Sequence, residues 1–151
     1  YAMRALELAG FVFGGWLVPK ALSAKPYCEP CRTYQRTTTL VKLPAGPKRP
    51  AFGKPNADDE LRLRGTAEEQ MRALFAEALL ANRASFNQLA KSLDATTVSL
   101  TAAMIVELVR CPRCFDGKLT ASLVTGQGTQ QPVRTLVAEQ PLSKDQAKIL
   151  A

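Results

Sequence analysis

Apolar and polar positions divide the chain into an apolar start, a proline-rich stretch, and segments with helical or alternating periodicity beyond it. An uncharged run extends from Leu8 to Pro19. Residues 37–43 (TTTLVKL) are rich in β-branched side chains and predict a short strand. The next sixteen residues, PAGPKRPAFGKPNADD, are rich in proline and glycine, so we expect a loop or linker rather than a paired strand.

Two segments show the period of amphipathic helices. The first is predicted from about Ala67 to Ala81, and Thr66 with Glu69 fits a capping box at its start. The second is shorter, with Ser85 as its N-cap. Together they predict an α-hairpin whose apolar stripes belong to a core or an interface. These stripes consist of Met71, Leu74, Phe75, Ala78, Leu79, Phe86, Leu89, Ala90 and Leu93.

The last third of the chain is predominantly strand-like. Apolar residues alternate from Val98 to Leu108, which favours a strand leading into Cys111, although part of this segment also fits a helix. The segment KLTASLVTGQGTQQPVRTLVAEQ predicts two strands joined around Gly126–Gly128. Ser143 and Gln146 fit a capping box for a short terminal helix.

The apolar start has three interpretations. Twelve uncharged residues are fewer than the roughly 20 that span a bilayer as a helix. We favour the end of a transmembrane helix or hairpin whose earlier part precedes Tyr1, and assign residues 1–22 to it. The alternatives are a buried or oligomer-forming helix of a soluble domain and a signal peptide with ALSA before Lys25. The signal peptide is the least favoured, because Lys20 interrupts the approach to the cleavage site.

The net charge of +7 belongs to one segment, residues 20–54, where eight bases face a single acid, Glu29. A basic flank after an apolar helix is typical of the cytoplasmic side of a membrane. The bases are candidates for contact with anionic lipid or nucleic acid, and a solvated linker is the alternative. They are Lys20, Lys25, Arg32, Arg36, Lys42, Lys48, Arg49 and Lys54.

The chain contains no histidine. This excludes, within the chain, Ser-His and Cys-His nucleophilic pairs and metal sites that use histidine. The acidic clusters Asp58–Glu60 and Glu68–Glu69 fit positions beside a linker and in a first helical turn, respectively. No phosphate-binding loop, dinucleotide fingerprint or metal-hydrolase motif is present. The sequence therefore predicts a protein that is not an enzyme and has no small-molecule substrate.

The four cysteines form two C-x-x-C pairs, YCEPC and RCPRC. Two thiolates at this spacing can bind one ion from a tight turn, and two such pairs complete the four-sulfur tetrahedral shell of structural zinc. We therefore expect Zn²⁺ to be bound by Cys28, Cys31, Cys111 and Cys114. Iron takes the same ligands. Disulfides need an oxidising compartment, and a thioredoxin-type couple needs a pair that opens a helix, so both are weaker alternatives.

The order of cysteine pair, strand, second cysteine pair and β-hairpin resembles a zinc ribbon over about residues 26–43 and 104–139. The resemblance implies a structural zinc ion. The two pairs are separated by 79 intervening residues, far more than in simple ribbons, so residues 44–95 are expected to be an insertion. The segment GGWLVPKALSAKPYCEPCRTY also resembles bacterial membrane proteins of unassigned activity, in which an apolar helix precedes a Tyr-Cys-x-x-Cys turn.

These patterns predict an α+β protein: an apolar helix over 1–22, a zinc-ribbon-like domain over 23–142 and a terminal helix over 143–151. The expected function is a membrane-proximal scaffold on the cytoplasmic side that binds a protein partner or forms a homo-oligomer. One alternative is a soluble cytoplasmic zinc ribbon that binds nucleic acid. A periplasmic disulfide-linked domain is another. The nucleic-acid patch would comprise Arg32, Tyr34, Arg36, Arg110 and Arg113.

Overall fold

The computed structural model describes residues 25–46, 56–93, 102–126 and 132–151, together with 3–4, 6–7, 10–13 and 15. The chain divides into two compact units, Tyr1–Gln35 and Arg36–Ala151. Most of the predicted apolar helix lies outside the described residues, as does much of the proline-rich segment. Among the described residues, no helix combines the length and the apolar character needed to cross a membrane.

In the first unit, a small antiparallel hairpin surrounds the first cysteine pair. It consists of β1 (Tyr27–Cys28) and β2 (Thr33–Tyr34), with Tyr27 opposite Tyr34 and Cys28 opposite Thr33. Strands of two residues make few ladder hydrogen bonds, so the turn between them contributes much of the hairpin's geometry.

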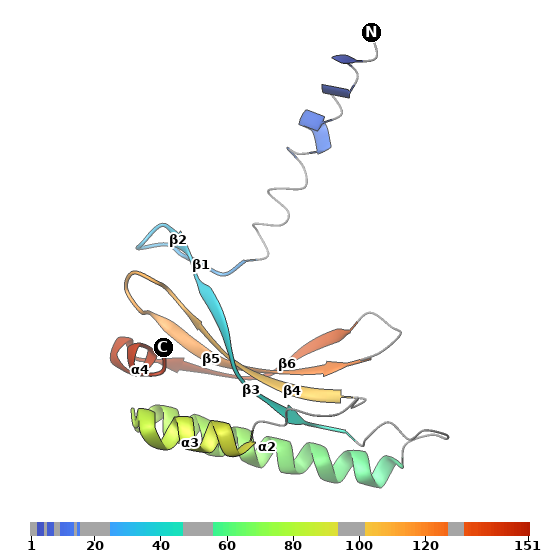
Figure 1. The fold of residues 1–151 in the computed structure, drawn as a ribbon, viewed down its shortest axis with the longest axis vertical. Coiled ribbons are helices and arrows are strands. Elements are labelled where there is room, and N and C mark those ends of the chain that lie inside the picture. The colour runs from blue at the N-terminus through green and yellow to red at the C-terminus, as the bar shows by residue number, and fades with distance from the viewer. Residues whose placement is uncertain are drawn as a thin grey trace. The chain divides into compact units, whose positions relative to one another are not determined.

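The second unit is built on a four-stranded antiparallel sheet in the order β3-β4-β5-β6, with α2 and α3 inserted between β3 and β4 (Figure 1). The fold is therefore mixed α+β, and the predicted α-hairpin and the predicted strand before Cys111 are confirmed. The elements are β3 (Arg36–Pro44), α2 (Ala57–Leu79), α3 (Arg83–Leu93), β4 (Ala102–Arg110), β5 (Gly117–Thr125), β6 (Val133–Leu142) and α4 (Lys144–Ile149).

Helices α2 and α3 run along one face of this sheet (Figure 1). Alternate residues of β4, Met104, Val106 and Leu108, are completely buried and belong to the same core cluster as Leu74 of α2 and Phe86 of α3. Successive strand residues point to opposite faces, so this alternation places the core on the helix side. The sheet unit thus has a substantial core of its own, larger than the small β unit expected from the sequence.

Helix α2 begins ten residues earlier than the predicted start at Ala67. The hydroxyl of Thr66 donates to the Arg62 carbonyl, 3.0 Å away, so Thr66 lies inside the helix and does not cap it. The acidic cluster Asp58–Glu60 occupies the first turn, where negative charge interacts favourably with the helix dipole. The prediction placed the start of the helix at Ala67 because the apolar stripe begins only there.

Of the two cap predictions for the other helices, one is wrong and one is confirmed. The Asn82 side chain accepts the Ser85 backbone N–H at 3.1 Å, so Asn82 acts as the cap of α3, not Ser85. At α4 the predicted box is confirmed. The Ser143 hydroxyl accepts from the Gln146 backbone N–H, and the Gln146 side chain accepts from the Ser143 N–H.

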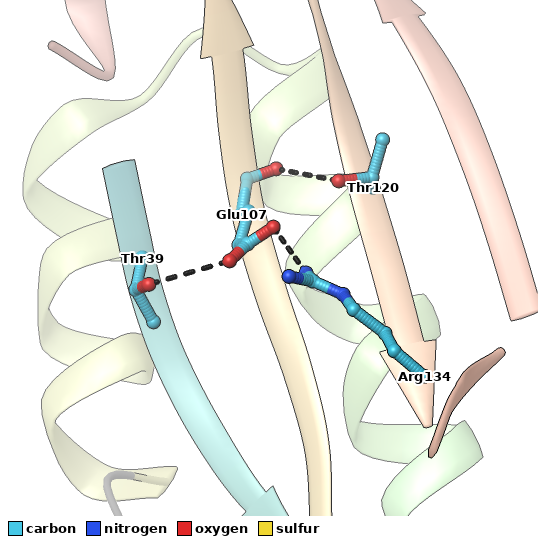
Figure 2. A network of polar contacts seen from close by, with 4 residues as sticks. All are labelled: Thr39, Glu107, Thr120 and Arg134. Atoms are coloured by element: carbon cyan, nitrogen blue, oxygen red, sulfur yellow. Dashed lines mark hydrogen bonds and ion pairs between the residues drawn. The ribbon is translucent and has the colours of Figure 1, made fainter. Parts of the chain in front are cut away.

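Glu107 lies on the sheet face opposite the helix-facing core residues and connects three strands (Figure 2). Its carboxylate accepts from the Thr39 hydroxyl of β3 at 3.5 Å and forms an ion pair with Arg134 of β6. The Thr120 hydroxyl of β5 donates to the Glu107 backbone carbonyl at 3.5 Å. Although Glu107 is only 8% exposed, its charge is therefore compensated.

Candidate metal centre

The structure brings the two cysteine pairs together. The Sγ atoms of Cys28, Cys31, Cys111 and Cys114 all lie within 4.8 Å of one another, a cluster that could hold a metal ion. Cys28 and Cys111 are buried, at 3% and 0% exposure, and the second cysteine of each pair is partly exposed. Two pairs separated by 79 intervening residues thus converge on one small volume.

The donor set fits one tetrahedral ion. Metal–sulfur bonds of about 2.3 Å in a tetrahedron give sulfur–sulfur edges of about 3.8 Å, which is compatible with the 4.8 Å limit of the cluster. Four thiolates and no nitrogen or oxygen ligand are the chemistry of structural zinc and of rubredoxin-like iron. The four cysteines would complete this shell without any other residue.

The first pair is held by its own hairpin. The Arg32 N–H donates to the Glu29 carbonyl at 3.2 Å and closes the turn between the two cysteines. The Gln35 N–H donates to the Pro26 carbonyl at 2.9 Å and ties the ends of the hairpin together. This local network orients Cys28 without using the core of the sheet.

The second pair is held by the sheet. Cys111 directly follows β4, and the turn leads into β5, so two paired central strands fix both ends of the pair. The Cys111 N–H donates to the Asp116 carbonyl at 2.8 Å, and the Phe115 N–H donates to the Cys111 carbonyl at 3.2 Å. The Arg113 N–H points to the Cys111 sulfur at 3.4 Å, a contact that favours a thiolate.

Close packing at the start of β5 requires a glycine. A Cβ on Gly117 would lie 2.6 Å from the Val109 carbonyl oxygen and 2.9 Å from the Cβ of Arg110. Any side chain would therefore push apart the strands that position Cys111.

Both turns share an unusual backbone feature. The residue directly after the second cysteine has a positive φ in each, 48° for Arg32 and 60° for Phe115. Neither residue is glycine, so each conformation carries a strain of about 1–2 kcal/mol. Two turns of unrelated sequence that adopt the same strained conformation at the same position are consistent with one geometric demand on both cysteine pairs.

Positive charges gather at the sheet end that carries Cys111. Arg36 of β3 is the register partner of Arg110 of β4, and like charges placed opposite each other are unfavourable. The Arg110 guanidinium and the Lys148 ammonium lie 5.4 Å and 6.0 Å from the centre of the Phe115 ring. Among the described residues, no ion pair balances these three cations. A divalent ion bound by four thiolates carries a charge of about −2, which would offset part of this positive charge.

The other basic residues predicted to bind lipid or nucleic acid divide into two groups. Lys25, Arg32, Arg36 and Lys42 are exposed. Lys20, Lys48, Arg49 and Lys54 lie outside the described residues.

The acidic clusters singled out from the sequence both lie in α2. Glu68 pairs with Arg64 one turn earlier at 3.4 Å, which places this acidic pair inside α2 and not in its first turn. The sequence patterns did not single out Glu107. The feature that could have identified it is its position as the one carboxylate within the apolar strand AAMIVELVR. Its ion pair with Arg134 and its hydrogen bond from the Thr39 hydroxyl give it a structural role.

Comparisons with known proteins by family model, by sequence and by structure find no match.

Proposed function

We propose that the chain is a zinc-stabilised interaction domain without catalytic activity, in which one structural Zn²⁺ joins the two cysteine pairs. The observation that carries the proposal is the convergence of four sulfur atoms within 4.8 Å. Four sulfur ligands fill the tetrahedral shell, so the ion would have no open position for substrate. Its contribution is to connect segments that are far apart in the sequence.

The α-hairpin supports a role in binding partners. Helix α2 has no buried side chain before Ala67, so its first ten residues extend beyond the part of the helix that contacts the core. Leu61 and Leu80 are each 72% exposed and Leu79 is 44% exposed. Leu79 and Leu80 are adjacent, so this exposed apolar end of the helix is a candidate for a protein interface. A membrane-proximal position and assembly through the apolar start stay predictions from the sequence.

Elemental analysis of the full chain, purified without added metal, tests the proposal. We expect about one zinc ion per chain. If the purified chain carries iron, refolding with Zn²⁺ should replace it with about one zinc ion per chain. Chain that carries neither metal and whose cysteines form disulfides would contradict the proposal and support the disulfide-linked alternative. Sedimentation of the unaltered chain and of the Leu80→Asp variant then tests the interface on α2. We expect the variant to shift toward monomer.

A further inference from the structure

The hairpin of the first cysteine pair carries two exposed aromatic rings. Tyr27 and Tyr34 are register partners, and they are 42% and 40% exposed. Their ring centroids lie 5.2 Å apart with an angle of 69° between the planes, an edge-to-face contact. The rings therefore have a defined mutual orientation while a large part of their surface faces solvent. We call these two residues the tyrosine pair.

The surroundings of the tyrosine pair are cationic. Lys25 and Arg32 of the same hairpin are exposed, and so is Glu29. Glu29 is the only acidic residue between Leu8 and Ala57. The partner that fits this segment is consequently an anion, and a polyanion gains most from its several cations.

The composition of the hairpin distinguishes among polyanions. Residues 25–36, KPYCEPCRTYQR, include no alanine, valine, leucine, isoleucine or methionine. Insertion into a lipid layer or into an apolar protein groove draws on aliphatic and large aromatic surface, which this segment offers only through two tyrosines. Aromatic rings beside cations are instead the arrangement that binds single-stranded nucleic acid, with bases on the rings and phosphates on the cations.

The alternation of the strand links the tyrosine pair to the metal centre. Tyr27 and Cys28 are adjacent in β1, so their side chains point to opposite sides of the hairpin. A metal ion that fixes Cys28 on one side would therefore fix the backbone from which the ring of Tyr27 projects on the other. We propose that the tyrosine pair, with Lys25 and Arg32, binds single-stranded nucleic acid. This inference rests on the proposed function, because the bound metal holds the hairpin.

Fluorescence anisotropy with labelled oligo(dT) and oligo(U) of about 20 nucleotides tests the inference on the full, zinc-loaded chain. We expect binding that weakens as salt rises from about 50 to 300 mM. The double variant Tyr27→Ala/Tyr34→Ala should weaken binding about tenfold or more. Tyr27→Phe/Tyr34→Phe retains both ring faces and should stay within about twofold. Leu136→Ala, at an exposed position of β6, is the matched control and should bind like the unaltered chain.

Separate outcomes would overturn the inference or the proposed function. Absence of salt-sensitive binding at about 50 mM salt, or unchanged binding by the double alanine variant, refutes the inference. Tyrosine-dependent binding to phosphatidylglycerol vesicles without oligonucleotide binding refutes it in favour of a lipid partner. If the alanine variant loses metal, Tyr27→Leu/Tyr34→Leu replaces it, since leucine keeps apolar bulk without a ring face. Metal analysis of the same samples separates the two claims: chain without metal refutes the proposed function, and metal-loaded chain without oligonucleotide binding refutes only this inference.

Discussion

The two cysteine pairs have the same spacing and the same strained backbone position but very different support. The second pair joins two nine-residue strands of the sheet, and Cys111 is completely buried. The first pair joins two strands of two residues each, with exposed tyrosines beside it. One half of the centre is therefore preorganised by a hydrophobic core. The other half has only local hydrogen bonds, so the proposed metal ion should order it most.

The largest effect is expected from removal of either pair of ligands. Cys28→Ser/Cys31→Ser and Cys111→Ser/Cys114→Ser should each reduce the bound metal from about one to zero per chain, because two thiolates alone hold zinc weakly. Elemental analysis and thermal melting check this. The Cys111 variant should also melt at a lower temperature, because it places a hydroxyl in the core.

Leu136→Ser is the matched control for these variants, since Leu136 is 58% exposed and lies on β6. Retention of about one metal per chain by either double variant would mean that the two pairs do not share one ion.

Metal removal should separate the two regions. With a chelator, we expect the amides of residues 25–35 to lose hydrogen-exchange protection while those of β4 and β5 keep it, because the sheet has its own core. Exchange measured by mass spectrometry on proteolytic fragments resolves these segments. Simultaneous loss of protection in both would show that the sheet also depends on the ion.

A smaller effect is expected at Gly117, which adjoins the second pair only. Gly117→Ala should destabilise the chain by about 1–3 kcal/mol, since the added Cβ would lie 2.6 Å from the Val109 carbonyl oxygen. Chemical denaturation measures this free energy. Gly65→Ala is a control of opposite sign: Gly65 lies inside α2 with nothing within 4 Å of an added Cβ, so it should stabilise by about 0.5–1 kcal/mol. Equal effects of the two would contradict the close packing at Gly117.

The smallest effect is expected from relief of the strain after the first pair. Arg32→Gly should strengthen metal binding by about 0.5–1 kcal/mol, or two- to fivefold, because glycine adopts a φ of 48° without strain. A competition titration with a metal indicator measures it. Phe115→Gly should gain less, because it also removes the ring that contacts Arg110 and Lys148. Weaker metal binding by Arg32→Gly would show that its side chain outweighs the strain.

Local sequence patterns predicted correctly those elements that depend on neighbouring residues. The strand at residues 37–43, the α-hairpin, the strands on either side of Gly126 and the capping box at Ser143 are all found in the structure. The start of α2 was missed because its first ten residues have no apolar stripe, and the cap of α3 lies at Asn82 because an amide oxygen three residues before Ser85 reaches its N–H. An apolar stripe shows where a helix contacts a core, and the helix itself can begin several residues earlier, as α2 does.

The sequence by itself determined the chemistry of the centre. Four cysteines in two C-x-x-C pairs offer four sulfur ligands, the absence of histidine excludes imidazole ligands from this chain, and the spacing within each pair follows from the length of one tight turn. Only the tertiary structure decided that the pairs meet, because 79 residues of loop, helix and strand lie between them and no local rule sets that distance. It also decided that Glu107 has a partner in Arg134 and that Arg36 lies opposite Arg110. Both depend on strand register, which the packing of the whole sheet establishes.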